Sequence, residues 1–429
     1  MTRERRRLLA SLGIVTFFIG LATLLQLLRE AEISAWDTIW AEDGSIFLAD
    51  GLNDSLVGKV VEPYGGYVHV LPRIVGAIVA ALPLENAAFS FALASFVTVS
   101  LVSTFVFFAS AQLIESVALR LTLSVLVLLL PAAGSELLGN ITNIHFFLLY
   151  GCFWALLWRS ESNAALASRG AVTAAATLGD PLAAAYLPLA LWSAVKRRTR
   201  RALVVPVIFT CGLAVQAAAM LATGSGPQRG TRFDAGDIPT LLSLRVAGSL
   251  LVGDRFIDDL WFRFGRWFSY IALAIVVSLL AVAVVRVDRR RKAFVVLCAS
   301  YAVFLFCFYL WGRGSAGMRP GSSAATWHLA GARFTLTPIL LLMTALLVLA
   351  DGEAKESLGR WVRRFAVVFV AILVAANFSL KSERSLGPRW KPKLAEARSQ
   401  CKRDPAPVRI LVAPAPFGFF VSTTCERIR

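Results

Sequence analysis

The sequence predicts an all-α, polytopic membrane protein with about 11 transmembrane helices. Composition is the first observation: 57% of the 429 residues are hydrophobic and 17% are charged, whereas soluble domains have about 45–50% and about 25%. The second is the apolar runs, such as 271–285 and 338–350, which carry no charge. Because these runs are continuous rather than alternating, they indicate helices and exclude a β-barrel.

The third observation is the placement of the basic residues. By the positive-inside rule, four short basic segments between apolar runs mark the cytoplasmic side: Arg3–Arg7, Lys196–Arg201, Arg286–Lys292 and Lys355–Arg364. The loops expected outside are 29–86, 133–143, 223–267 and 312–332. The formal net charge of +17 would suggest a nucleic-acid partner in a soluble protein. Here the basic loops explain the charge, no basic domain face is found, and we expect no nucleic-acid partner.

A count of crossings constrains the first third of the chain. Arg7 and Lys196 both belong to cytoplasmic segments, so the number of crossings between them must be even, yet seven apolar segments lie there. The weakest is 67–84, which is short and contains His69 and Arg73. We therefore expect 67–84 to be a membrane-parallel helix within the long external loop 29–86. The alternative is that 170–195, broken at Gly179-Asp180-Pro181, is one bent crossing.

The remaining segments give a multi-pass protein of the cell membrane, with its N-terminus in the cytoplasm and its C-terminus outside. The first is an uncleaved helix rather than a signal peptide, because no small-residue cleavage site follows it. Residues 1–380 form the transmembrane domain, and 381–429 form a short tail that caps the outer surface. The expected crossings are 8–28, 87–111, 119–132, 144–158, 170–178, 181–195, 202–222, 268–286, 293–311, 333–350 and 365–380.

The six cysteines suggest one disulfide at most. Cys401 and Cys425 lie in the polar tail, 24 residues apart, and are a candidate disulfide if the tail is outside. The other four cysteines lie in apolar runs and are expected to be small core residues. No Cys/His spacing suggests zinc.

Ionisable residues near membrane depth are often functional, and here they gather on the expected outer side. In the first cluster, Glu42 and Asp43 stand beside Gly44, flanked by Trp36, Trp40 and Phe47. A carboxylate near an apolar surface can act as a general base with a raised pKa. The alternative is a helix cap or a solvated acidic turn.

The second cluster is PYGGYVHVLPR, residues 63–73. Its two glycines allow close approach of a ligand, and Tyr64 and Tyr67 are typical interfacial aromatics. His69 and Arg73 are four residues apart and would share a helical face. Arg73 could bind a phosphate; alternatively it extends to lipid headgroups.

Two further clusters lie at the outer ends of crossings. Polar groups that could hold a sugar follow a predicted crossing: Glu136, Asn140, Asn143 and His145. The alternative is helix capping and a satisfied core histidine. Arg333 begins a later helix in GARFTLTP, where a cation opposes the helix dipole. A nearby anion such as a phosphate would relieve this; alternatively the side chain lies in the headgroup layer.

Together, these motifs resemble a GT-C-type membrane glycosyltransferase, the class that includes protein O-mannosyltransferases and bacterial lipid-linked sugar transferases. The resemblance rests on Glu42-Asp43-Gly44, on 63–73, on the polar turn 136–145 and on Gly331-Ala332-Arg333-Phe334. It extends through about residue 350.

The resemblance implies an inverting enzyme that moves a sugar from a polyprenyl-phosphate carrier to an envelope glycan, lipid or protein on the outer face. Asp43 matches the family's base, with Glu42 as the alternative. Donor phosphate would meet Arg73, Arg333 and His69. The sugar or acceptor would meet Tyr64, Tyr67, Glu136, Asn140, Asn143 and His145. No cofactor is required, and a divalent metal is possible but not indicated.

A lipid or sugar transporter or flippase is the main rival. It would favour inverted repeats, broken helices and charges at the midplane. The sequence shows no repeat, and only the break at 179–181 supports this function. A polymerase-like ligase or a non-catalytic assembly subunit is a further alternative.

Overall fold

The protein is mostly helical. A computed structural model describes residues 3–29, 33–132, 134–160, 162–197, 199–224, 233–315, 318–319, 331–352, 357–379 and 383–428. Helices account for 78% of the described residues and strands for 4%. Within these described ranges, five helical stretches are long and apolar enough to cross a membrane: Leu84–Ser110, Arg200–Thr223, Ala235–Val252, Arg289–Arg313 and Ala332–Asp351. The chain is therefore a helical membrane protein, as its composition predicts.

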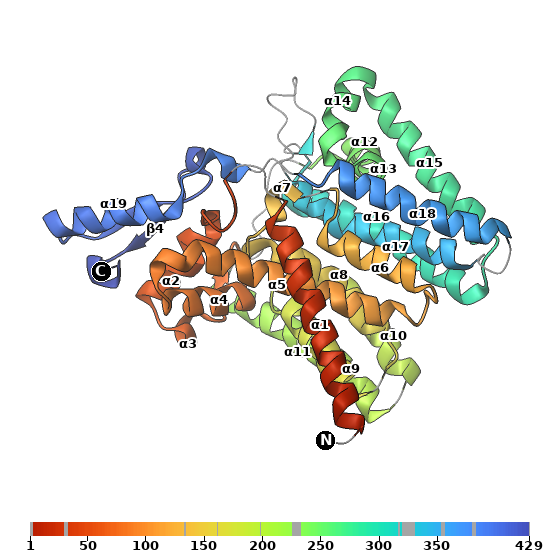
Figure 1. The fold of residues 1–429 in the computed structure, drawn as a ribbon, viewed down its shortest axis with the longest axis horizontal. Helices are drawn as coiled ribbons and strands as arrows, with labels where there is room; N and C mark the ends of the chain where they lie inside the picture. Colours follow the sequence, from red (N-terminus) through yellow and green to blue (C-terminus); the bar gives the residue numbers. More distant parts are fainter. Residues whose placement is uncertain are drawn as a thin grey trace.

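Long helices pack side by side as a bundle, with the N-terminus at one end (Figure 1). They are α1 (Arg3–Leu27), α5 (Ala87–Ser110), α6 (Val117–Leu128), α8 (His145–Leu157), α9 (Asn163–Thr177), α10 (Leu187–Arg197), α11 (Arg200–Thr223), α15 (Arg266–Val284), α16 (Arg289–Arg313), α17 (Leu336–Gly352) and α18 (Ser357–Ala376).

The centre of the bundle is formed by α8 and α17. The span that contains α17 is 94% buried inside the protein, whereas α11 is only 28% buried. Every residue of α8 from His145 to Leu156 is buried. In a membrane, the exposed apolar faces of α11 meet lipid, whereas α17 packs on α16, α18 and α8.

Short polar side chains cap the first turns of four helices of the bundle. Ser116, Ser162, Thr199 and Asp288 accept backbone hydrogen bonds at the starts of α6, α9, α11 and α16. Each cap satisfies N–H groups that lack a partner within the helix. These caps explain where the apolar runs become helical.

The first loop folds into short elements against the bundle. These are η1 (Asp43–Leu48, a π-helical turn), α2 (Ala49–Asn53), α3 (Leu56–Lys59), β1 (Pro63–Tyr64), β2 (Tyr67–Val68), α4 (Val70–Ala80) and η2 (Leu84–Asn86). Of these elements, α4 covers most of 67–84, the segment expected to form a membrane-parallel helix. Its 11 residues span roughly 16 Å at 1.5 Å per residue, about half of a bilayer core.

Glycines allow this loop to be compact. The β1–β2 turn is Gly65-Gly66, and both have positive φ (60° and 92°), which favours glycine. In α4, a Cβ on Gly76 would lie 2.3 Å from the Phe47 carbonyl oxygen. The close packing of α4 on η1 therefore requires glycine at position 76.

The segment 223–267, expected to be a polar loop, is more structured and more apolar than predicted. It contains η5 (Ala235–Asp237), α12 (Ile238–Leu241), η6 (Leu242–Gly248), α13 (Ser249–Val252) and α14 (Asp254–Phe264). Continuous helical turns over Ala235–Val252 are apolar enough to cross a membrane. The sequence does not mark this stretch as a crossing because charged residues flank it on both sides.

The tail folds back onto the first loop (Figure 1). It consists of η9 (Glu383–Leu386), α19 (Trp390–Arg403), β3 (Val408–Leu411), η10 (Ala415–Phe417), β4 (Phe420–Thr423) and α20 (Cys425–Ile428). The Trp390 indole donates to the Leu84 carbonyl at 2.5 Å. Cys401 and Cys425 are joined by a disulfide, with their Cα atoms 5.5 Å apart.

Candidate functional site

Asp43 joins the first loop to the bundle. Its side chain is fully buried. Oδ1 accepts hydrogen bonds from the Thr142 backbone N–H at 2.9 Å and from the Thr142 hydroxyl at 2.5 Å. Oδ2 accepts from the Ile141 N–H at 3.0 Å. The carboxylate thus satisfies the start of η3 (Thr142–Ile144) and α8, and both of its oxygens are occupied.

Burial raises the pKa of Asp43 to about 6, and the hydrogen bonds from Thr142 and Ile141 and the nearby Arg384 charge partly oppose that rise. Arg384 itself is buried, donates to the Thr38, Leu138 and Gly139 carbonyls, and comes from the tail. Asp43 therefore lies where the tail, the first loop and the start of α8 meet.

Glu42 differs from its neighbour. Its side chain is half-buried, and no hydrogen bond or ion pair joins its carboxylate to any residue that the structure describes. Its charge acts on Tyr64 and Tyr67, and raises the pKa of both hydroxyls beyond the effect of burial; Tyr64 reaches about 12. Of the two adjacent carboxylates, Glu42 is the one whose oxygens accept no hydrogen bond from the described part of the chain.

The β1–β2 hairpin carries the aromatic groups on which the charge of Glu42 acts. Tyr64 pairs with Tyr67 across the hairpin, which places both side chains on one face. His69 follows β2; its ring centroid lies 4.2 Å from that of Tyr67, and its Nε2 lies 3.2 Å from the Tyr64 carbonyl oxygen. Burial and the neighbouring His145 lower the pKa of His69, so this histidine is neutral at pH 7.

His145, at the start of α8, is buried between His69 of the first loop and Asp180. The rings of His69 and His145 are 6.2 Å apart. His145 Nδ1 donates to the Thr142 carbonyl at 2.8 Å, so its Nε2 faces Asp180 Oδ2 at 3.6 Å. Asp180, which precedes η4 (Pro181–Tyr186), also caps that turn through the Leu182 N–H. A residue before a proline is expected in a turn, and the Asp180 carboxylate also faces His145.

Arg313 and Arg333 bring positive charge to the β1–β2 hairpin. Arg333 lies in η8 (Ala332–Thr335), just before α17, and Arg313 ends α16. Both lower the pKa of Tyr64 and of Tyr67, so both lie close to the hairpin. The Arg333 side chain is 36% exposed, which leaves its guanidinium accessible.

Glu136 supplies the anion that the sequence suggested near Arg333. In α7 (Gly134–Leu137), its carboxylate accepts from the Arg333 backbone N–H at 3.1 Å and lies 3.5 Å from the Arg333 guanidinium. It also accepts from the Gly331 N–H at 3.3 Å. Among the described residues, no three His, Cys, Asp or Glu side chains gather as a metal ion would require.

Arg73 is occupied within the loop. It is 4% exposed, pairs with the Asp50 carboxylate and donates to the Glu62 carbonyl at 3.1 Å. Because α4 begins at Val70, His69 and Arg73 do not share a helical face. In this arrangement Arg73 holds α4 to α2 and cannot also bind a phosphate.

Asn140 and Asn143 bond within their own turn. Both side-chain amides donate to the Glu136 carbonyl, and Asn140 Oδ1 accepts from the Asn143 N–H at 3.0 Å. Their polar groups are used to shape the turn that presents Glu136. The structure thus brings together Glu42, Tyr64, Tyr67, His69, His145 and Arg333, and it leaves Asp43, Arg73, Asn140 and Asn143 in supporting roles.

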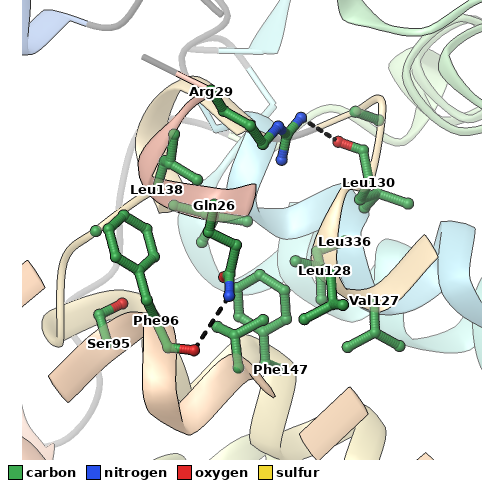
Figure 2. A pocket seen from close by; sticks show the side chains of 14 residues that line it. Gln26, Arg29, Ser95, Phe96, Val127, Leu128, Leu130, Leu138, Phe147 and Leu336 are labelled. Atoms are coloured by element: carbon green, nitrogen blue, oxygen red, sulfur yellow. Dashed lines mark hydrogen bonds between the residues drawn. The ribbon is translucent and has the colours of Figure 1, made fainter. Parts of the chain in front are cut away.

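A small cavity lies nearby at the end of α1. Figure 2 shows Gln26 donating to the Phe96 carbonyl and Arg29 donating to the Leu130 carbonyl, at 3.1 and 3.0 Å. Its volume of about 20 Å³ admits a water molecule but not a sugar. These bonds instead join the end of α1 to α5 and the residue after α1 to the segment that follows α6.

The sequence alone gives no functional role to Arg313 or to Asp180. Arg313 is the last residue of an apolar helix and Asp180 stands at a helix break, two signals that could have singled them out. No protein-family model matches the chain, and no curated protein matches it. The functional argument therefore rests on the residues of the site.

Proposed function

We propose that this membrane protein is an inverting GT-C-like glycosyltransferase that takes a sugar from a polyprenyl-phosphate carrier. The observation that supports this most is the half-buried Glu42 carboxylate, which has no partner among the described residues. Its charge acts on the Tyr64 hydroxyl, and so do the charges of Arg313 and Arg333. A base beside a cationic site is what transfer from a lipid phosphate requires. The acceptor is an envelope glycan, lipid or protein.

In the proposed reaction, Glu42 takes the proton of the acceptor hydroxyl. The hydroxyl oxygen bonds to C1 of the sugar while the bond from C1 to the phosphate oxygen breaks. The carrier phosphate leaves with that electron pair, and attack on the opposite face inverts C1. This assignment replaces Asp43 by Glu42, because both Asp43 oxygens already accept hydrogen bonds.

Arg313 and Arg333 are proposed to stabilise the charge that the leaving phosphate gains. Guanidinium groups suit phosphate oxygens because they donate in a planar fork. Glu136 would orient Arg333 through its backbone and side-chain contacts. Tyr64 and Tyr67 would contact the sugar, with His69 and His145 behind them.

We also propose 11 crossings, with the N-terminus in the cytoplasm and the tail outside the cell membrane. The short length of α4 supports a first loop that stays on one side. The disulfide of the tail supports an oxidising compartment, since disulfides persist there. In this scheme Ala235–Val252 remains on the outer side.

The test uses purified protein in proteoliposomes with a panel of radiolabelled polyprenyl-phosphate sugars and envelope extract. We expect label to move to an acceptor with wild type and not with Glu42→Gln. Donor binding, measured separately, should survive in the variant because the base is not needed to hold the donor. Transfer that continues unchanged in Glu42→Gln would refute this base.

A flippase is the second candidate. The buried His145–Asp180 pair, whose side chains are 7% and 5% exposed, lies at a helix break, and such groups can serve transporters. Movement of labelled lipid between leaflets, without transfer from any donor and with loss in Asp180→Asn, would favour it over the transferase.

A further inference from the structure

A groove lies at the opposite end of the bundle from the proposed active site. Its walls are the first half of α10 and the first half of α16, and its floor is formed by residues that follow α5 and residues at the end of α8. It has a volume of about 420 Å³. Because α10 packs on α8 and α11 whereas α16 packs on α17, a gap remains between α10 and α16.

The groove has one apolar part and one basic part. Leu189 and Trp192 of α10 face Phe294, Leu297 and Tyr301 of α16 across it. Trp192 is 47% exposed, whereas Leu189 and Phe294 are nearly buried. The apolar wall is therefore continuous with the outer surface of the bundle, where acyl chains lie.

Two guanidinium groups, those of Arg159 and Arg290, line the other part. Both residues are exposed, and no side-chain hydrogen bond or ion pair joins either guanidinium to another described residue. Gln112 is the remaining polar side chain of the lining. Two unpaired cations above an apolar groove are complementary to an anionic head with long hydrocarbon chains.

We propose that this groove binds an anionic phospholipid. Arg159 and Arg290 hold the phosphate, and an acyl chain lies along Trp192 and Leu297. The basic segments 196–201 and 286–292 adjoin α10 and α16, so the lipid belongs to the cytoplasmic leaflet. The site is separate from the transferase site and stands whether or not that function holds.

Native mass spectrometry of the full-length protein tests the head-group contact. Phosphatidylglycerol and phosphatidylcholine with identical chains are titrated against wild type and against Arg159→Ala/Arg290→Ala. Each arginine near a membrane surface contributes about fivefold to anionic-lipid binding, so we expect the double variant to lose about thirtyfold in phosphatidylglycerol affinity. Arg159→Lys/Arg290→Lys should recover most of it.

The matched control is Arg200→Ala/Arg289→Ala, which removes two exposed arginines of the same basic region that do not line the groove. It should keep its preference for phosphatidylglycerol. An equal loss in this control, or no preference of wild type for phosphatidylglycerol, would overturn the proposal. So would polyprenyl phosphate displacing phosphatidylglycerol, since the occupant would then be the carrier.

Brominated acyl chains test the apolar part. Phosphatidylglycerol brominated on its chains should quench part of the tryptophan fluorescence, and that part should disappear in Trp192→Phe. Trp361→Phe, which removes another exposed tryptophan outside the groove, should not abolish the saturable quenching. Quenching that is identical in Trp192→Phe and wild type would refute the placement of the chain.

Discussion

Thr142 donates two hydrogen bonds to one oxygen of Asp43, from its backbone N–H at 2.9 Å and from its hydroxyl at 2.5 Å. With the bond from Ile141, this contact joins residues 98 and 99 positions apart in the sequence. It fixes the first loop on the start of α8. Glu42, the preceding residue, is thereby held at the proposed site, and its carboxylate has no hydrogen-bond or ion-pair partner among the described residues.

Asp43→Asn should lower the stability of the protein. The Asn amide can accept with only one oxygen, and its NH₂ group would face a backbone N–H that is itself a donor. Leaving a buried donor unpaired costs about 1–3 kcal/mol. The melting temperature in detergent measures the effect, and Asp259→Asn, at an exposed carboxylate, should melt like wild type.

The same variant should change how stability depends on pH. The pKa of Asp43 is raised from 3.8 to about 6, so its contribution to stability is full below pH 3.8 and is lost as pH rises through about 6. The stability advantage of wild type over Asp43→Asn should therefore shrink between pH 4 and 7. A gap that widens with pH would contradict the raised pKa.

Arg333→Lys should impair catalysis more than folding. Lysine keeps the charge and leaves the backbone bond to Glu136 intact, but it cannot donate in a fork to a phosphate. Loss of one transition-state donor lowers kcat by roughly 10²–10³. Arg319→Ala is the control, because Arg319 is exposed and pairs with Asp234 and Asp237. Equal losses in both variants would remove Arg333 from the site.

Gly76→Ala should destabilise the first loop. The added Cβ would lie 2.3 Å from the Phe47 carbonyl oxygen, and backbone must move to relieve that contact. We expect a loss of about 1–3 kcal/mol, typical of overpacking, seen as a lower melting temperature. At Gly20, nothing lies within 4 Å of the corresponding Cβ position, so Gly20→Ala should melt at or above the wild-type temperature.

The sequence predicts the helical membrane fold because apolar runs are local features of the chain. It also offers Cys401 and Cys425 as a candidate disulfide on the condition that the tail is outside, and the structure contains that disulfide. It could not tell Glu42 from Asp43, since the difference comes from Thr142 in another element. Nor could it show that Arg73 is paired with Asp50 or that Glu136 meets Arg333 across 197 positions. The partners of these side chains are determined by the packing of distant segments, which cannot be deduced from a single sequence.

The most direct measurement compares sugar transfer by Glu42→Gln and Asp43→Asn at equal folded concentration. Removal of a general base costs about 10²–10⁴ in rate. We expect that loss in Glu42→Gln with an unchanged melting temperature, whereas Asp43→Asn should melt earlier and retain more activity per folded molecule. Full activity of Glu42→Gln, with loss confined to folded Asp43→Asn, would contradict Glu42 as the base.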